Sequence, residues 1–98
     1  MSNSNDYSNK RIRKAIRVYG SVQGVGFRYR TKYAAEAIGV TGWVKNEPDG
    51  SVSMELQGTE EQIDKVFASI NQGTYISIER MNVHSIPLDE SEYGFYYD

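Results

Sequence analysis

The chain has 98 residues, which is enough for one domain, and no cysteine, which excludes disulfides, thiolate nucleophiles and cysteine-based metal sites. Its net charge of −2 is unevenly divided: residues 1–49 hold 9 Lys/Arg and 4 Asp/Glu, whereas residues 50–98 hold 2 and 9. The single histidine, His84, excludes a histidine cluster, and no apolar run approaches the roughly 20 residues that span a bilayer.

The first residues are polar and lack the apolar core of a signal peptide. We therefore expect a disordered tail over residues 1–10, one domain over residues 11–98, and a cytoplasmic protein. A basic cluster follows the tail, and its charges either solubilise the start of a strand or draw anions toward the domain. The sequence favours the first interpretation for the cluster Lys10, Arg11, Arg13 and Lys14.

The first half of the domain has the pattern of a strand, a loop and a helix. Ile16 and Val18 alternate with more polar neighbours over Lys14–Gly20, which predicts a β-strand. Apolar side chains then recur every three or four residues over Phe27–Ile38, the spacing of an amphipathic helix. Gly39 is placed to end that helix.

A hairpin and a second helix follow. Thr41–Glu47 and Ser51–Gln57 have strand patterns, and the Pro-Asp-Gly sequence between them predicts a turn. Thr59 and Gln62 form a capping-box pattern ahead of an apolar helical stripe. The sequence therefore predicts a helix that begins after Thr59.

The last third of the chain has weaker patterns. Gly73 is expected to end the second helix. The apolar residues beyond it shift from even to odd positions, which predicts a loop or bulge near Glu79. We place a strand at about Arg80–Ile86 and a short last strand at about Tyr93–Tyr97, with alternate residues from Tyr93 onward on one face.

The element order β-α-β-β-α-β, followed by a short fifth strand, belongs to the α+β class. The economical arrangement is the ferredoxin-like split βαβ sandwich, in which both helices cover one face of one antiparallel sheet. Right-handed crossovers leave few other topologies.

The segment between the first strand and the first helix has the composition of an anion-binding loop. Gly20, Gly24 and Gly26 precede Arg28 closely. Glycine lets successive backbone N–H groups turn toward one ligand, and the helix that follows presents its positive dipole end. Arginine adds a planar charge that matches two phosphate oxygens. The sequence therefore predicts a phosphate site.

Several phosphate chemistries do not fit this loop. A cysteine nucleophile would stand six residues before Arg28, where the chain has Val22. The Gly-Lys-Ser/Thr ending of a Walker loop and the dinucleotide-binding glycine spacing are both absent from the sequence. Asp49 is isolated in a turn, unlike the paired acids of aspartyl-phosphate enzymes. No covalent nucleophile is evident.

Two segments resemble the signatures of the acylphosphatase family. Gly20–Arg28, which reads Gly-Ser-Val-Gln-Gly-Val-Gly-Phe-Arg, is similar to the first signature. Gly42–Asn46, which reads Gly-Trp-Val-Lys-Asn, is similar to the second, and so are the residues that follow it, Gly50, Val52 and Gly58. The resemblance covers about Arg13–Gly58 and extends more loosely to Tyr97. It implies the ferredoxin-like fold and an enzyme that hydrolyses acyl phosphates to a carboxylate and inorganic phosphate, with no cofactor and no metal ion.

The resemblance also implies roles for individual residues. Arg28 and backbone N–H groups hold the phosphate, while the Asn46 carboxamide positions the attacking water. An amide cannot act as a general base, so the proton of the water passes to the substrate phosphate or to solvent. The loop residues that the resemblance assigns to phosphate binding are Val22, Gln23, Gly24, Val25, Gly26 and Phe27.

The expected ligands are a small acyl phosphate as substrate and inorganic phosphate or sulfate as a competing anion. We expect a monomer with no nucleic-acid or membrane partner. An RNA-binding sheet is disfavoured because Ser51–Gln57 contains no aromatic residue. A phosphate-binding module without turnover would lack the water holder, and Asn46 is present. A carbamoyl-phosphate domain of a larger maturation factor is disfavoured because no residue follows position 98.

Overall fold

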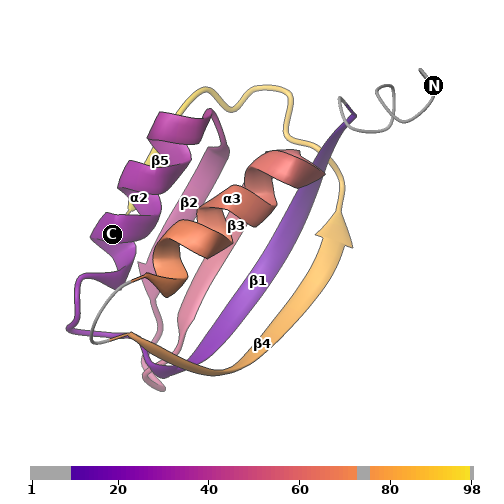
Figure 1. Cartoon of the computed structure of the whole chain (residues 1–98). Helices are drawn as coiled ribbons and strands as arrows, with labels where there is room; N and C mark the ends of the chain where they lie inside the picture. Colours follow the sequence, from indigo (N-terminus) through magenta and orange to yellow (C-terminus); the bar gives the residue numbers. More distant parts are fainter. Residues whose placement is uncertain (1–9, 73–75, 98) are drawn as a thin grey trace.

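In the described part of the chain, two helices lie across one face of a five-stranded sheet (Figure 1). The computed structural model describes residues 10–72 and 76–97. The strands follow the order β4-β1-β3-β2-β5 across the sheet. This arrangement confirms the predicted ferredoxin-like sandwich. Its elements are β1 (Arg11–Ser21), α2 (Phe27–Ile38), β2 (Thr41–Asn46), β3 (Val52–Thr59), α3 (Glu60–Asn71), β4 (Ser77–Ile86) and β5 (Phe95–Tyr97).

The first four strands pair antiparallel, and the last strand is the exception to the predicted antiparallel sheet. β1 lies between β3 and β4, and β3 also pairs with β2, all in antiparallel register. β5 pairs with β2 in parallel register, with Trp43 opposite Tyr96. The reason is the connection over residues 87–94, which crosses one end of the sheet and returns the chain in the direction of β2 (Figure 1).

The hydrophobic core lies between the helices and the sheet, and the alternate apolar residues of the strands point into it. Ile16 and Val18 of β1 are buried, and they pair with the buried residues Met54 and Val52 of β3. Burying an aliphatic side chain fully contributes about 1.5–3 kcal/mol to folding. The helices cover this face with Phe27, Thr31, Ala34 and Ala35 from α2 and with Ile63, Val66 and Ile70 from α3.

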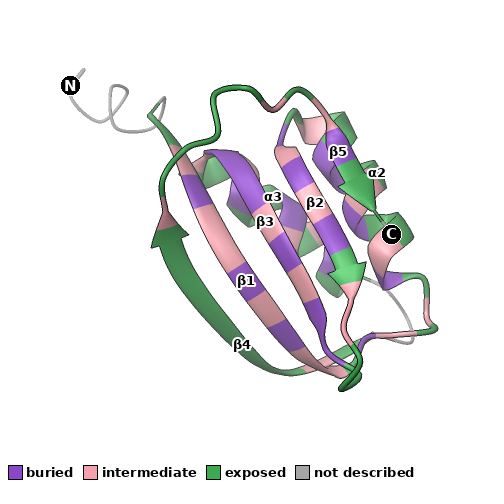
Figure 2. Cartoon of the chain, turned by 180° about the vertical axis from the view of Figure 1, so that it is seen from behind, coloured by how far each residue is buried: buried purple, intermediate pink, exposed green. Residues whose placement is uncertain are grey.

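The edge strand β4 lies outside the helical cover and is exposed along almost its whole length (Figure 2). Its pairing with β1 shifts where Tyr19 lies opposite Arg80 and Gly20 lies opposite Ile78, so that Glu79 has no partner in the ladder. The predicted irregularity near Glu79 is therefore a bulge. The strand begins at Ser77, before the bulge, rather than at Arg80. The bulge accommodates one extra residue, so the strand pairs with β1 on both sides of it although the apolar positions shift there.

The capping box of α3 is confirmed. The Thr59 hydroxyl accepts a hydrogen bond of 3.1 Å from the Gln62 N–H, and the Gln62 side chain accepts one of 2.9 Å from the Thr59 N–H. The helix ends at Asn71, and the predicted stop at Gly73 lies outside the described residues. In the described part of the chain, no helix has the length and apolar character needed to cross a membrane.

The last strand is shorter than predicted. β5 begins at Phe95, whose side chain is buried, whereas Tyr93 precedes the strand and is 90% exposed. The expectation that the strand begins at Tyr93, with Tyr93 on the same face as Phe95 and Tyr97, is therefore wrong, because only the three residues from Phe95 to Tyr97 find a partner strand in β2.

Arg13 of β1 is buried, at 4% exposure, in a cluster of polar side chains. Its guanidinium donates to the Glu92 carboxylate at 2.7 Å, to the Glu55 carboxylate at 2.9 Å and to the Gln57 side chain at 3.1 Å. The hydrogen bond to Glu92 is the largest cause of a raised pKa at Arg13. The interpretation that Arg13 only solubilises the strand is therefore wrong, since it ties the connection between β4 and β5 to the sheet.

Candidate active site

The loop over residues 22–26 joins the end of β1 to the start of α2. Gly24 and Gly26 have φ values of 75° and 80°, in the left-handed region that favours glycine. An added Cβ would meet no atom within 4 Å at either position, so backbone conformation rather than space requires glycine there. Left-handed residues of this kind occur in the backbone nests that turn N–H groups toward an anion.

Gly20, which the sequence groups with this loop, belongs to β1. Its φ is 135°, and a Cβ at this position would overlap the carbonyl oxygen of Ser77 on β4. Gly20 therefore permits the close approach of two strands, and the loop itself contains two of the three glycines.

The start of α2 has no side-chain cap. Gly26 is the N-cap residue, and the first turn contains no acidic side chain. The first helical hydrogen bond runs from the Arg30 N–H to the Gly26 carbonyl oxygen at 2.9 Å. The N–H groups of Phe27, Arg28 and Tyr29 therefore have no intrahelical acceptor and lie at the positive end of the helix dipole. Such an end binds phosphate well.

The two ends of the predicted phosphate loop are anchored in the core. Val22 is 1% exposed and Phe27 is 2% exposed, while Val25 is half-buried against the same core. The buried Thr31 hydroxyl donates to the Phe27 carbonyl oxygen at 2.8 Å. Because the side chains at both ends point inward, the backbone between them is held at the surface.

Gln23 has a partner that the sequence did not predict. Its side-chain amide donates hydrogen bonds of 2.8 Å to the carbonyl oxygens of Glu47 and Ser51. These two residues flank the turn between β2 and β3. Gln23 therefore fastens the loop to the hairpin that carries Asn46, and no local pattern in the sequence indicates this contact.

Asn46 is the last residue of β2 and lies in a row with Val52 and Val18 across the sheet. Both valines are fully buried, and Val44, two residues earlier on β2, is buried as well. The Asn46 side chain therefore lies on the face that the helices cover. Its Oδ1 atom is buried and accepts no hydrogen bond from any described residue. Leaving a buried acceptor unpaired costs about 1–3 kcal/mol, so this atom suits a donor from water or a ligand. The Thr41 hydroxyl oxygen is likewise buried with no partner among the described residues.

Arg28 lies in the first turn of α2 and is half-buried. Its guanidinium lies 5.8 Å from the centre of the Tyr97 ring on β5. Within residues 10–72 and 76–97 it forms no ion pair, whereas Arg11, Arg13 and Arg17 each pair with a carboxylate. Among the described residues, no carboxylate therefore neutralises the charge of Arg28. Arg28 and Tyr97 lie far apart in the sequence, so no local pattern predicted this contact.

The topology brings these groups to one end of the sheet. β1 and β2 run in the same direction because each pairs antiparallel with β3. The loop that follows β1, the start of α2 and Asn46 at the end of β2 therefore share one end of the molecule (Figure 1). The Gln23 hydrogen bonds join the two segments there. Arg28, the loop N–H groups and the Asn46 carboxamide thus form one candidate site.

The described residues contain no group of three or more His, Cys, Asp or Glu side chains arranged to hold a metal ion. Arg30, whose role the sequence leaves open, is exposed on α2. His84 is exposed on β4, away from the end of the sheet that carries the loop.

Comparisons with known proteins show which family the chain resembles. The sequence model of the Acylphosphatase family matches residues 14–97. An acylphosphatase of Bifidobacterium longum is 41% identical over 86 residues, which cover 86% of this chain and 89% of that protein. An acylphosphatase of Thermococcus kodakarensis is 44% identical over 64 residues, which cover 65% of this chain and 70% of that protein.

A solved structure gives the same result. The crystal structure of acylphosphatase from Bacillus subtilis matches with a TM-score of 0.80 and 30% identity, covering 89% of this chain and 98% of that one. The likeness therefore extends through both predicted signatures and through nearly the whole described fold. On these grounds, the chain belongs to the acylphosphatase family, enzymes that hydrolyse acyl phosphates.

Proposed function

We propose that the chain hydrolyses small acyl phosphates without a metal ion, holding the phosphate with Arg28 and the loop over residues 22–27 and the attacking water with Asn46. The observation that carries this proposal is the buried Oδ1 of Asn46, unpaired among the described residues, at the end of the sheet where the loop N–H groups and Arg28 also lie. An anion site and an unpaired hydrogen-bond acceptor at the same end of the sheet suit the addition of water to a bound phosphate.

The phosphate is held by positive charge from two sources. The N–H groups at the start of α2 and in the glycine loop donate to its oxygens, and the Arg28 fork bridges two of them. These groups neutralise the charge on the equatorial oxygens in the transition state, which is the task that a metal ion performs in many phosphoryl-transfer enzymes.

Asn46 orients the water. Its Oδ1 accepts one O–H of the water, so that a lone pair of the water oxygen faces the phosphorus. The new P–O bond forms as the bond between phosphorus and the acyl oxygen breaks, and the carboxylate leaves with the electron pair. The proton of the water passes to a phosphate oxygen or to solvent, since an amide is no base. A carboxylate is a good leaving group, so alignment and charge neutralisation are sufficient.

Phosphate release from benzoyl phosphate, measured with and without EDTA, tests this proposal. We expect the same rate in both conditions, and competitive inhibition by inorganic phosphate or sulfate, because the loop recognises the anion rather than the acyl group. Activity that EDTA abolishes and Mg²⁺ restores would overturn metal independence. Non-competitive inhibition by phosphate would place the anion outside the substrate site.

We also propose that the enzyme works as a cytoplasmic monomer. A chain without cysteine needs no oxidising compartment for disulfide formation. Sedimentation across a tenfold concentration range tests the first point and cell fractionation tests the second. A mass that rises with concentration would contradict the monomer, and activity recovered outside the cytoplasmic fraction would contradict the location.

A further inference from the structure

The face of the sheet opposite the helices carries a hollow of about 330 Å³. Figure 2 shows this open face, with the helices behind the sheet. The hollow is formed by side chains of β1, β2, β3 and β4. We propose that it binds a purine nucleoside monophosphate, with the base beside Trp43 and the phosphate at Arg17 and Arg80. This second site does not depend on the function proposed above.

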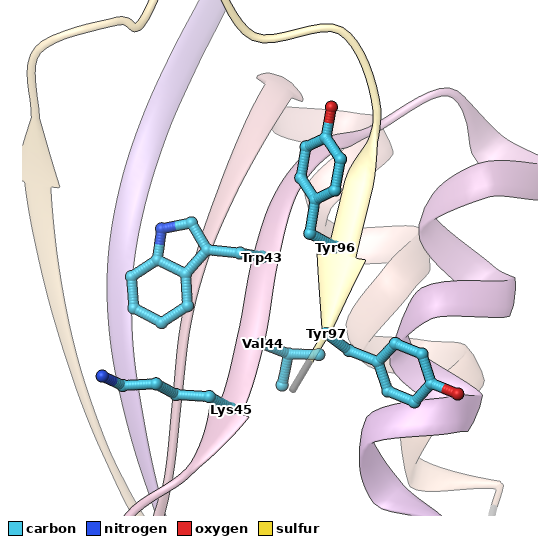
Figure 3. Close-up of a pocket in the computed structure, with 5 residues that line it drawn as sticks. All are labelled: Trp43, Val44, Lys45, Tyr96 and Tyr97. Atoms are coloured by element: carbon cyan, nitrogen blue, oxygen red, sulfur yellow. The ribbon is translucent and has the colours of Figure 1, made fainter.

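The hollow and the candidate active site lie on opposite faces of the sheet. Successive residues of a strand point to opposite faces. Val44 of β2 is buried under the helices and Asn46 points the same way, so Trp43 points to the open face. Figure 3 shows the Trp43 ring on one side of β2 and the Tyr97 ring on the other, toward α2. A ligand in the hollow therefore does not occupy the place of the acyl phosphate.

Small side chains form the floor of the hollow. The register places one row of side chains across the open face, in the order Trp43, Glu55, Ala15 and His84. In the next row Ser53 lies opposite Arg17. Ala15 and Ser53 rise only a short distance above the sheet, so the larger indole of Trp43 borders the hollow with its ring. Aromatic rings of this kind stack on nucleobases.

The β4 side of the hollow is polar. Asn82 and His84 line it there, and both are exposed. A carboxamide donates one hydrogen bond and accepts another, which matches the N6 and N7 edge of adenine. The Glu55 carboxylate also lines the hollow, but it is already paired with Arg13 at 2.9 Å. Because a hydrocarbon ring would leave the polar groups of β4 without partners, the hollow favours a ring with nitrogen atoms at its edge.

Two guanidinium groups approach one ring at the other end of the hollow. Arg80 lies 4.0 Å and Arg17 lies 5.9 Å from the centre of the Tyr19 ring. Among the described residues Arg80 forms no ion pair, and Arg17 pairs only with the exposed Asp49, at 3.3 Å. Two positive charges therefore face one carboxylate here, and guanidinium groups bind phosphate oxygens well.

The two ends of the hollow are spaced for one nucleotide. Arg80 lies opposite Tyr19, which is four residues along β1 from Ala15 in the row of Trp43. Four residues of a strand span about 13 Å, and an extended nucleoside monophosphate reaches a comparable distance from its base to its phosphate. A free base or a free phosphate would contact only one end.

The fluorescence of Trp43, the only tryptophan of the chain, reports on this site. We expect AMP to change the fluorescence with saturation, and inorganic phosphate to leave it unchanged. Adenosine should need a roughly tenfold higher concentration, because it lacks the hydrogen bonds of a charged group. No response to AMP, or an equal response to inorganic phosphate, would overturn the proposal.

Arg80→Leu tests the phosphate end. Arg80 is exposed on the edge strand, so the variant should fold as the wild type does. We expect the dissociation constant of AMP to rise by roughly tenfold or more, and that of adenosine to stay the same. Arg11→Leu is the matched control, because it removes the same charge from the far end of β1. Equal dissociation constants for AMP in the two variants would rule out the phosphate contact and, with it, the proposed ligand.

The second site and the proposed function fail separately. Arg28→Lys should bind AMP as the wild type does, because Arg28 belongs to α2 behind the sheet. A loss of AMP binding in this variant would place AMP at the phosphate loop and refute the second site. Arg80→Leu should hydrolyse benzoyl phosphate at the wild-type rate. If the wild type hydrolyses no acyl phosphate but binds AMP as expected, the proposed function is wrong and the second site stands.

A single-stranded oligoadenylate offers the same base and phosphate groups as AMP. The hollow has room for one base, and β3, at the centre of the sheet, carries no aromatic residue on which a further base would stack. We therefore expect a short oligoadenylate to bind no more tightly than AMP in the same fluorescence titration. Clearly tighter binding of the oligomer would overturn the mononucleotide and assign the open face to single-stranded nucleic acid.

Discussion

The side-chain amide of Gln23 donates a 2.8 Å hydrogen bond to the carbonyl oxygen of Glu47, the residue that follows Asn46. A second bond of the same length goes to Ser51 across the turn. The segment that we propose to hold the phosphate is thereby fastened to the segment that we propose to hold the water. The link adds to the pairing of β1 and β2 through β3 in fixing the separation of the two segments.

Replacing Gln23 by Leu removes both donors and keeps a similar volume. We expect kcat/KM for benzoyl phosphate to fall about tenfold or more, since the loop and Asn46 lose their alignment. The free energy of unfolding should fall by about 1–3 kcal/mol, because two carbonyl oxygens lose their donors. Gln72→Leu, at an exposed position after α3, is the control. Wild-type kinetics in Gln23→Leu would show that the link has no role in alignment.

Arg28→Lys tests whether the Arg28 guanidinium holds the phosphate. A compact ammonium cannot bridge two phosphate oxygens, so kcat/KM should fall and the inhibition constant for phosphate should rise, each by roughly tenfold to a hundredfold. Arg30→Lys is the matched control, since Arg30 is exposed two residues further along α2. If both variants have the same kinetics, Arg28 does not hold the phosphate.

Asn46→Ala separates water positioning from phosphate binding. We expect kcat to fall by about a hundredfold or more, while the inhibition constant for phosphate changes little, because an oriented water matters in the transition state and not in anion binding. Urea denaturation of the same variant checks that the nearby turn is intact. A phosphate affinity that collapses together with kcat would assign Asn46 to anion binding instead.

The buried cluster around Arg13 predicts a large effect on stability. Breaking its pair with Glu92 by Arg13→Met leaves a buried carboxylate without its partner and should lower the free energy of unfolding by about 3–5 kcal/mol. Arg11→Met removes an exposed pair with Glu90 and should cost at most about 1 kcal/mol. Urea unfolding at neutral pH compares the two. Similar losses in both variants would mean that the Arg13 cluster is not a special support of the fold.

Asp49 makes the hairpin turn sensitive to acid. The Ser51 hydroxyl and N–H donate to its carboxylate, and these bonds, with a smaller contribution from Arg17, lower the pKa of Asp49. A lowered pKa in the folded state adds stability that is present above the ordinary carboxyl pKa and is lost as the pH falls through the folded value. Wild-type protein should therefore be more stable than Asp49→Asn at pH 7, and the difference should shrink as the pH falls below the ordinary carboxyl pKa of about 3.9. A difference that does not vary with pH would contradict this account.

Local patterns predicted the secondary structure well where the pattern is strong. The helix expected over Phe27–Ile38 has those bounds in the structure. Gly26 before it and Gly39 after it both adopt left-handed conformations, which interrupt the helix at its two ends. The capping box at Thr59 is confirmed, since both of its hydrogen bonds join residues three positions apart. The strands were predicted with less accurate ends, because their limits depend on partner strands that lie far away in the sequence.

The candidate site was predicted in a different way. The glycines and Arg28 suggested an anion site by their chemistry alone, whereas Asn46 was singled out only through the resemblance to acylphosphatases. Their individual roles stay predictions until the variants above are measured. The contacts that hold them, Gln23 with the hairpin and Tyr97 with Arg28, were not predicted, since each joins residues that are distant in sequence.

The sequence by itself determined which residues form helices and strands and which faces are apolar, because periodicity and caps act over only a few residues. Only the tertiary structure decided that Arg13 is buried, since its partner Glu92 lies 79 residues away and approaches through the connection that crosses the sheet. The same crossing decided that β5 pairs parallel with β2 and so brings Tyr97 beside Arg28. The alternation of a strand indicates which side of it is buried, but not which distant segment covers that side or in which direction it runs.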